Sequence, residues 1–300
     1  MPRVRDYLLL HLVILAWGFT AILGKLITLP PIEVVLWRTA IASAGFALLA
    51  RWLRQNLRIS RTDLWKMVGV GAILGLHWIL FFLSARLATA SVSLAALPTA
   101  MLWCSLIEPY ADGTRRWRPL ELLVGTIIVG AVWMIYEVEL RYWLGFTVGI
   151  VSALLAALFA VMNKQLVARS HYAVMGYYQM LGALAITALA WLVATPGQLT
   201  LPGAWDGLWI FILATVCTVG AYAGYMAVLR RMSVFTVNVV YNLEPVYGII
   251  LAVLIFGSQE HMSGGFYIGA SVIMGSVLIV PWLSRWVERK PAVKEHPFIP

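Results

Sequence analysis

Apolar stretches long enough to cross a membrane follow one another along almost the whole chain. A membrane-spanning helix needs roughly 20 predominantly apolar residues. Charged side chains make up only 12% of the 300 residues, about half of the share that a soluble protein carries. The pattern therefore predicts an all-α polytopic membrane protein. Ten transmembrane helices are expected, at residues 7–27, 33–50, 65–85, 89–107, 120–136, 143–163, 172–194, 207–228, 234–256 and 265–283.

Positive charge is distributed unequally between the two sides of the expected bundle. Membrane proteins concentrate Lys and Arg in their cytoplasmic loops. With the N-terminus in the cytoplasm, 18 of the 22 Lys and Arg residues fall in cytoplasmic segments and only Arg86 and Arg141 fall in outer loops. This predicts an even number of spans with both termini cytoplasmic. Because the cations lie in short runs between apolar stretches, the net charge of +9 does not indicate a nucleic-acid partner.

The sequence offers little for metal or catalytic chemistry. Its two cysteines, Cys104 and Cys217, lie in apolar runs, which argues against a disulfide framework and against a thiolate metal site. No GxSxG, HExxH or Walker motif occurs, and the loops are too short for a catalytic domain. We therefore expect no enzyme activity, no cofactor and no metal.

Short motifs recur between the two halves at an offset of about 140–147 residues. The corresponding positions are Trp37-Arg38 and Tyr178-Gln179, Lys25 and Lys164, and Pro98 and Pro245. Five spans per half is an odd number, so the second half inserts with the opposite orientation. We expect a first repeat at 1–140, an inverted repeat at 141–284 and a cytoplasmic tail at 285–300. Inverted repeats place a substrate site near the midplane, where they meet.

Several short motifs carry a resemblance to a known family. They are Trp17-Gly18, Arg38, the small-residue turn after Arg86, Glu244-Pro245, and the segment 257–260. With these motifs the chain resembles the drug/metabolite transporter superfamily in its EamA-type ten-helix form, and less closely the YddG-like exporters of aromatic amino acids. The resemblance implies a central cavity, export of amino acids, other metabolites or drugs, and a bacterial inner membrane. Glu108-Pro109 departs from the family, which more often has Gly-Glu there.

Glu244 is the one carboxylate, among 13 Asp and Glu residues, that falls well inside an expected span. It flanks a polar stripe at helical spacing, formed by Asn238, Tyr241, Asn242 and Pro245. The stripe is interpreted either as a cavity wall or as a structural feature. In the first case Glu244 meets a substrate amine or carries a coupling proton; in the second it bonds to backbone groups freed by Pro245.

Deep aromatic side chains provide the other candidates for substrate binding. An indole N–H away from the membrane surface needs a partner, and an aromatic wall suits flat side chains and cations. The alternative for each of these side chains is plain packing or interfacial anchoring. The candidates are Trp17, His77, Trp78, Phe81, Trp103 and Tyr222, the last in a stripe with Thr218 and Tyr225.

Arg38 lies about six residues into its span, where it either faces a substrate carboxylate or has a structural role. Lys25 and Lys164 are expected to snorkel from equivalent helix ends, and Asn163 to cap a helix end. Pro98 and Pro245 are expected to mark bends that let the bundle rock.

The leading hypothesis is a secondary transporter that exports aromatic or other neutral amino acids by alternating access. A lipophilic-cation exporter coupled to protons is the alternative, and an intramembrane enzyme or structural protein is the hypothesis from another class. The expected partners are a small-molecule substrate and membrane lipid. Four GxxxG pairs favour tight packing within one chain over dimerisation, which predicts a monomer or weak dimer.

Overall fold

The computed structural model describes residues 3–111, 119–138, 140–167, 169–195, 197, 199–229, 231–232, 237, 240–241 and 243–288. All regular structure within these residues is helical. Asn238, Asn242 and most of the expected cytoplasmic tail lie outside them.

The helices follow the expected spans closely. They are α1 (Val4–Leu26), α2 (Pro31–Trp52), α3 (Arg61–Leu87), α4 (Ala90–Ala96), α5 (Ala100–Ala111), α6 (Pro119–Val138), α7 (Trp143–Lys164), α8 (Tyr172–Ala194), α9 (Ala204–Ala214), α10 (Ala221–Leu229), α12 (Glu244–Phe256) and α13 (Gly264–Glu288). Short 3-10 turns are η1 (Leu97–Thr99), η2 (Leu140–Tyr142) and η4 (Gly257–Glu260), and a π-helical turn, η3 (Thr215–Gly220), joins α9 to α10.

Seven segments in the described part of the chain are long and apolar enough to cross a membrane. They comprise α1, α2, α3, the α4–α5 pair, α7 with η2, α8, and the α9–α10 pair. Helices α6, α12 and α13 lie where the remaining three spans are expected. The prediction of an all-helical polytopic membrane protein is confirmed, whereas the count of ten spans stays a prediction.

Local sequence signals explain several helix ends. Ser60 caps α3 by accepting a hydrogen bond from the Asp63 backbone N–H, and Thr89 caps α4 by accepting one from that of Val92. Pro31 occupies the first position of α2, where its missing N–H costs nothing. The caps at Ser60 and Thr89 set where α3 and α4 begin.

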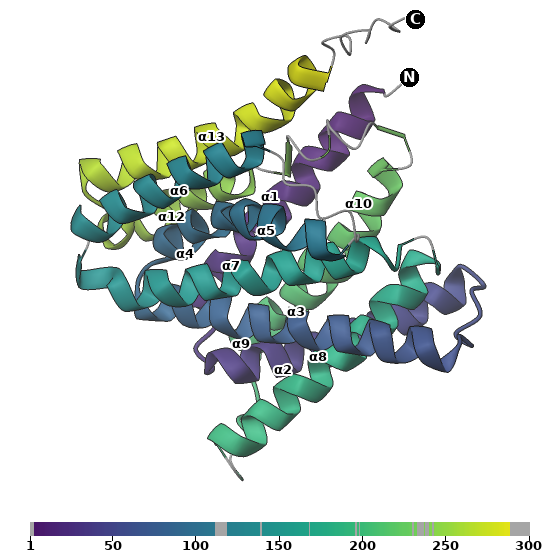
Figure 1. The fold of residues 1–300 in the computed structure, drawn as a ribbon. Coiled ribbons are helices and arrows are strands. Elements are labelled where there is room, and N and C mark those ends of the chain that lie inside the picture. Colours follow the sequence, from purple (N-terminus) through teal and green to yellow (C-terminus); the bar gives the residue numbers. More distant parts are fainter. Residues whose placement is uncertain are drawn as a thin grey trace, which may run out of the picture.

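Helix α3 lies at the centre of the bundle and packs on both α7 and α8 (Figure 1). Helix α1 packs on α10 and α12, and α2 packs on α8 and α9. Helices α6 and α13 pack together at one edge of the bundle (Figure 1). The start of α1 and the end of α13 lie at the same end of the bundle (Figure 1). Elements from both halves of the chain thus alternate through the core.

Two helix pairs approach so closely that only glycine fits between them. A Cβ on Gly71 of α3 would lie 2.0 Å from the backbone oxygen of Gln179 in α8. A Cβ on Gly18 of α1 would lie 2.9 Å from the backbone oxygen of Glu244 in α12. Small residues allow such approaches in membrane bundles. These contacts lie within one chain, as expected for Gly71 and its GxxxG partner Gly75.

The α3–α8 contact predicts the effect of one added methyl group. Gly71→Ala should lower the melting temperature of the detergent-purified protein, because the new Cβ meets backbone; overpacking of this kind costs about 1–3 kcal/mol. The control is Gly69→Ala on the same helix, where a Cβ meets nothing within 4 Å. Equal melting temperatures for the two variants would contradict the close packing of α3 on α8.

Candidate functional site

Two prolines interrupt the helices that run through the middle of the bundle. Pro98 lies in the 3-10 turn η1 between α4 and α5. Pro245 follows Glu244, the first residue of α12. Proline removes a backbone donor and clashes with the preceding turn, so a continuous helix is not favoured at either position. Discontinuous helices of this kind line the midplane sites of many transporters.

Three aromatic rings and a carboxylate meet near the start of α12. The ring of Trp17 lies 5.4 Å from that of Tyr225 and 5.7 Å from that of Tyr241, measured between centroids. Glu244, one turn after Tyr241, is only 9% exposed. Its carboxylate forms no hydrogen bond or ion pair with any residue that the structure describes. We call these four residues the Trp17 cluster.

A second cluster surrounds Arg38 on α2. The guanidinium carbon lies 3.7 Å from the ring centroid of Trp78, and Nε donates a 2.9 Å hydrogen bond to the Thr218 hydroxyl oxygen. Arg38 is 3% exposed. We call Arg38, Trp78 and Thr218 the Arg38 cluster.

The segment formed by η3 and α10 contributes residues to both clusters. Thr218 contacts Arg38, Tyr225 contacts Trp17, and Tyr222 lies between them in sequence. The Tyr222 ring packs edge-on against Phe46 at 5.7 Å, and its buried hydroxyl has no hydrogen-bond partner among the described residues. The predicted stripe of Thr218, Tyr222 and Tyr225 therefore contacts residues of the first half at each of its three positions.

The structure favours packing roles for two other candidates. His77 Nδ1 lies 2.9 Å from the backbone oxygen of Ser152 and 2.8 Å from its hydroxyl oxygen, which ties α3 to α7. Phe81 is 4% exposed and belongs to the apolar core. Trp103 on α5 is half-buried, and its indole N–H has no acceptor in the described part of the chain.

Asn163 does not cap the end of α7, contrary to expectation. Its side-chain oxygen accepts a 2.6 Å hydrogen bond from Nε2 of Gln179, which is 1% exposed. A buried amide needs a partner, and this need outweighs capping. Gln179 stands where the sequence repeat places the counterpart of Arg38.

Sequence reasoning missed a buried ion pair at the end of α1. Lys25 was expected to snorkel, but its Nζ lies 2.7 Å from Oε1 of Glu260, which is fully buried. The carboxylate also accepts hydrogen bonds from the backbone N–H groups of Ala90 (3.0 Å) and Ser91 (2.8 Å) at the start of α4. Burial alone would raise the pKa of Glu260, but the hydrogen bonds from Lys25, Ser91 and Ala90 lower it overall.

An equivalent pair lies at the opposite end of the bundle. Lys164, the repeat counterpart of Lys25, forms an ion pair with Glu108 instead of snorkelling freely. This pair is largely exposed: 69% for the Lys164 side chain and 31% for Glu108, against 18% and 0% for Lys25 and Glu260. The repeated lysines were the signal that could have identified both pairs. We call the two ends of the bundle the Glu260 end and the Glu108 end.

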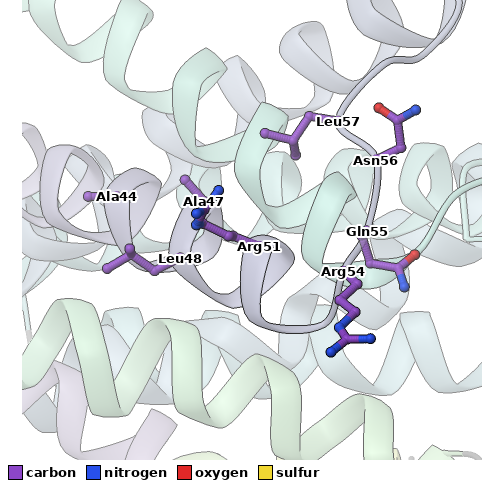
Figure 2. A pocket seen from close by; sticks show the side chains of 8 residues that line it. All are labelled: Ala44, Ala47, Leu48, Arg51, Arg54, Gln55, Asn56 and Leu57. Carbon is purple, nitrogen blue, oxygen red and sulfur yellow. The ribbon is translucent and has the colours of Figure 1, made fainter.

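A surface pocket lies where α2 ends and the loop to α3 begins (Figure 2). Figure 2 shows Arg51 close to Ala47 of α2, and Arg54 beside Gln55 in the loop that follows. None of the predicted site residues lines this pocket. It is therefore separate from the Trp17 and Arg38 clusters.

Comparison with known proteins relates the second half of the chain to a transporter family. Residues 143–282 match the EamA-like transporter family, just under half of the chain. No curated protein matches this chain. One crystal structure is similar over 95% of this chain and 100% of its own, with a TM-score of 0.66 and 18% identity. At that identity the similarity establishes the fold alone. The chain is thus a polytopic helical membrane protein with an EamA-like second half.

The buried ion pair predicts a difference between two matched variants. Glu260→Gln should destabilise the protein by about 3 kcal/mol, because it leaves a largely buried lysine without its counter-ion. Glu108→Gln removes the same charge from the exposed pair and should cost at most about 1 kcal/mol. Thermal melting in detergent measures both. Equal shifts would contradict the difference in burial.

The lowered pKa of Glu260 also predicts a pH dependence. A carboxylate whose pKa is lower in the folded state stabilises the protein fully above its unfolded pKa, here taken as 4.5, and loses this contribution as pH falls through the folded value. The melting-temperature difference between wild type and Glu260→Gln should therefore stay constant from about pH 8 to pH 5 and shrink only at lower pH. A difference that already shrinks near neutral pH would show that the Glu260 pKa is raised.

Proposed function

We propose that the protein is a secondary transporter that exports aromatic or other neutral amino acids, or related small metabolites, by alternating access. The EamA-like match over residues 143–282 supports a transporter of small molecules. The proposal places the two inverted repeats at 1–140 and 141–284, and assigns the protein no catalytic activity.

The unequal burial of the two Lys–Glu pairs carries the proposal. Each pair joins the first half of the chain to the second, one at each end of the bundle. Alternating access requires that the halves separate at one end while they stay closed at the other. In this structure the pair at the Glu260 end is dry, whereas the described pairs at the opposite end each keep a cation that is about half exposed or more: Lys164–Glu108, Arg169–Asp63 and Arg231–Asp6. A conformation that is closed at the Glu260 end is expected to show this difference in exposure.

Further contacts support closure at the Glu260 end. Asp206, at the start of α9, accepts hydrogen bonds from the Thr28 backbone N–H at 2.9 Å and from the Thr28 hydroxyl at 2.6 Å. Arg86 donates to the backbone oxygens of Gly24 and Leu29, at 3.1 Å and 2.9 Å, which holds the α1–α2 loop in place within the first half. Opening this end requires that the Thr28–Asp206 bonds and the contacts of Glu260 break together, so it needs compensation from substrate or from the Glu108 end.

The Trp17 cluster supports an amine-bearing substrate with a flat or apolar side chain. The unpaired carboxylate of Glu244 suits a substrate ammonium group, and the faces of Trp17 and Tyr241 suit an aromatic ring or a cation. The same features suit a lipophilic cation, with Glu244 as counter-charge or proton carrier. This alternative predicts pH-driven flux.

The orientation belongs to the proposal as well. We place both termini in the cytoplasm of a bacterial inner membrane, with the Glu260 end outside. The distribution of 18 of 22 Lys and Arg residues supports this. The common position of the start of α1 and the end of α13 agrees with it (Figure 1). The chain is expected to act as a monomer or weak dimer with membrane lipid and a small-molecule substrate.

Counterflow in proteoliposomes tests the function. Vesicles loaded with single aromatic or aliphatic amino acids should take up the same labelled amino acid saturably, because a carrier exchanges substrate across the membrane. Glu244→Gln should weaken this exchange about tenfold, since it removes the charge that faces the ammonium group. Wild-type exchange should persist without a pH gradient.

The control is Lys66→Gln, which removes a charge from an exposed position near the start of α3, outside both clusters and outside the ion pairs. Absence of exchange for every amino acid, in vesicles that contain folded protein, would overturn the amino acid proposal. Flux of lipophilic cations that depends on a pH gradient and is lost in Glu244→Gln would establish the alternative.

A further inference from the structure

Arg38 is a buried cation without a counter-ion. Its hydrogen bond to Thr218 is the only one that it forms with residues that the structure describes, and none of their carboxylates pairs with it. A guanidinium carries five N–H donors and no acceptor, so most of its donors remain unused. A buried, unpaired charge destabilises a membrane protein and commonly marks a functional site.

Other cations inside the bundle have found partners. Arg86 donates to three backbone oxygens, and Lys25 pairs with Glu260. Glu33 lies on the same helix as Arg38 and is only 2% exposed, yet one of its carboxylate oxygens has no partner and it does not pair with Arg38. Of these cations in the described part of the chain, only Arg38 combines near-complete burial with a single hydrogen bond and no counter-ion.

The surroundings of Arg38 leave one edge of the guanidinium available. Trp78 covers one face at 3.7 Å, and the ring of Phe82 lies 5.9 Å away. Thr218 occupies Nε. The two terminal nitrogens are left, and two parallel N–H groups at that edge match the two oxygens of a carboxylate.

A local irregularity in the opposing helix supports this contact. Thr218 lies in the π-helical turn η3, and its hydroxyl donates a 2.7 Å hydrogen bond to the backbone oxygen of Leu213, five residues earlier. The hydroxyl oxygen is thereby oriented to accept from Arg38. Single π turns are rare and occur frequently at functional sites.

The position that the expected sequence repeat pairs with Arg38 carries a neutral side chain. At the equivalent position of the second half, Gln179 is buried to the same degree and is satisfied by Asn163. A neutral amide with a partner meets the packing requirement there. The first half instead retains a cation whose donors are unsatisfied.

We propose that Arg38 binds the carboxylate of the transported molecule, with Trp78 and Thr218 holding the guanidinium in position. The ligand class is a small monoanionic or zwitterionic carboxylate, because one guanidinium edge balances one carboxylate but not a phosphate dianion. This inference rests on the proposed transport function. It adds a site for the substrate carboxylate to the site that the Trp17 cluster offers for the ammonium group.

Binding to the purified protein tests the assignment without transport. Calorimetric titration should show that wild type binds L-phenylalanine at least about tenfold more tightly than L-phenylalaninamide, which lacks the carboxylate. Arg38→Gln should abolish this preference. Arg38→Lys should keep part of it, because lysine retains the charge but not the paired donors. Arg51→Gln, a cation on the exposed end of the same helix, should behave as wild type.

Stability without ligand provides a second, independent measurement. Arg38→Met keeps an apolar contact with Trp78 and removes the unpaired charge, so its melting temperature should equal or exceed that of wild type. A structural arginine would give the opposite result, a melting temperature several degrees lower. That result would overturn the assignment.

The outcomes separate this inference from the proposed function. Failure of wild type to bind L-phenylalanine, or an unchanged carboxylate preference in folded Arg38→Gln, overturns the role of Arg38. If amino acid counterflow persists in that case, the transport function stands without it. If carboxylate-selective binding depends on Arg38 but counterflow is absent, the binding site stands and the transport function fails.

Discussion

The structure depends on how polar groups are satisfied in a bundle that offers them almost no water. Glu260 shows the requirement most clearly: it is fully buried, yet Lys25 and two backbone N–H groups of α4 surround its carboxylate. This contact joins α1, α4 and η4, and so ties the two halves of the chain together at one end. Burying a carboxylate costs several kcal/mol, so these partners determine whether that end stays closed.

Two buried charged groups lack such partners, and the proposed ligand site rests on them. Glu244 and Arg38 carry opposite charges, both are buried, and neither has a counter-ion in the described part of the chain. Most other polar groups in the bundle, such as Gln179 and His77, are satisfied by a neighbouring helix. The segment η3–α10 carries both Thr218, which contacts Arg38, and Tyr225, which contacts Trp17. The proposed zwitterionic substrate would supply both missing partners.

The sequence predicted much of the fold because hydropathy and length determine membrane spans almost independently of tertiary contacts. The expected bends at Pro98 and Pro245 coincide with helix breaks, since proline acts locally. The partners of single side chains could not be predicted in this way. Lys25 and Glu260 are 235 residues apart, and only the folded bundle brings them together. The repeat of Lys25 at Lys164 was visible, but its meaning required the partners.

In the proposed transport cycle the Glu260 end has to open. Leu87 lies three residues before Ala90 in the first half, Ser258 lies two residues before Glu260 in the second, and both are exposed. Cysteines at these two positions, in a protein whose Cys104 and Cys217 are replaced by alanine, allow a short reducible cross-linker to hold this end closed. We expect cross-linking to stop amino acid counterflow and reduction to restore it. Full counterflow in the cross-linked protein would show that this end does not open during transport.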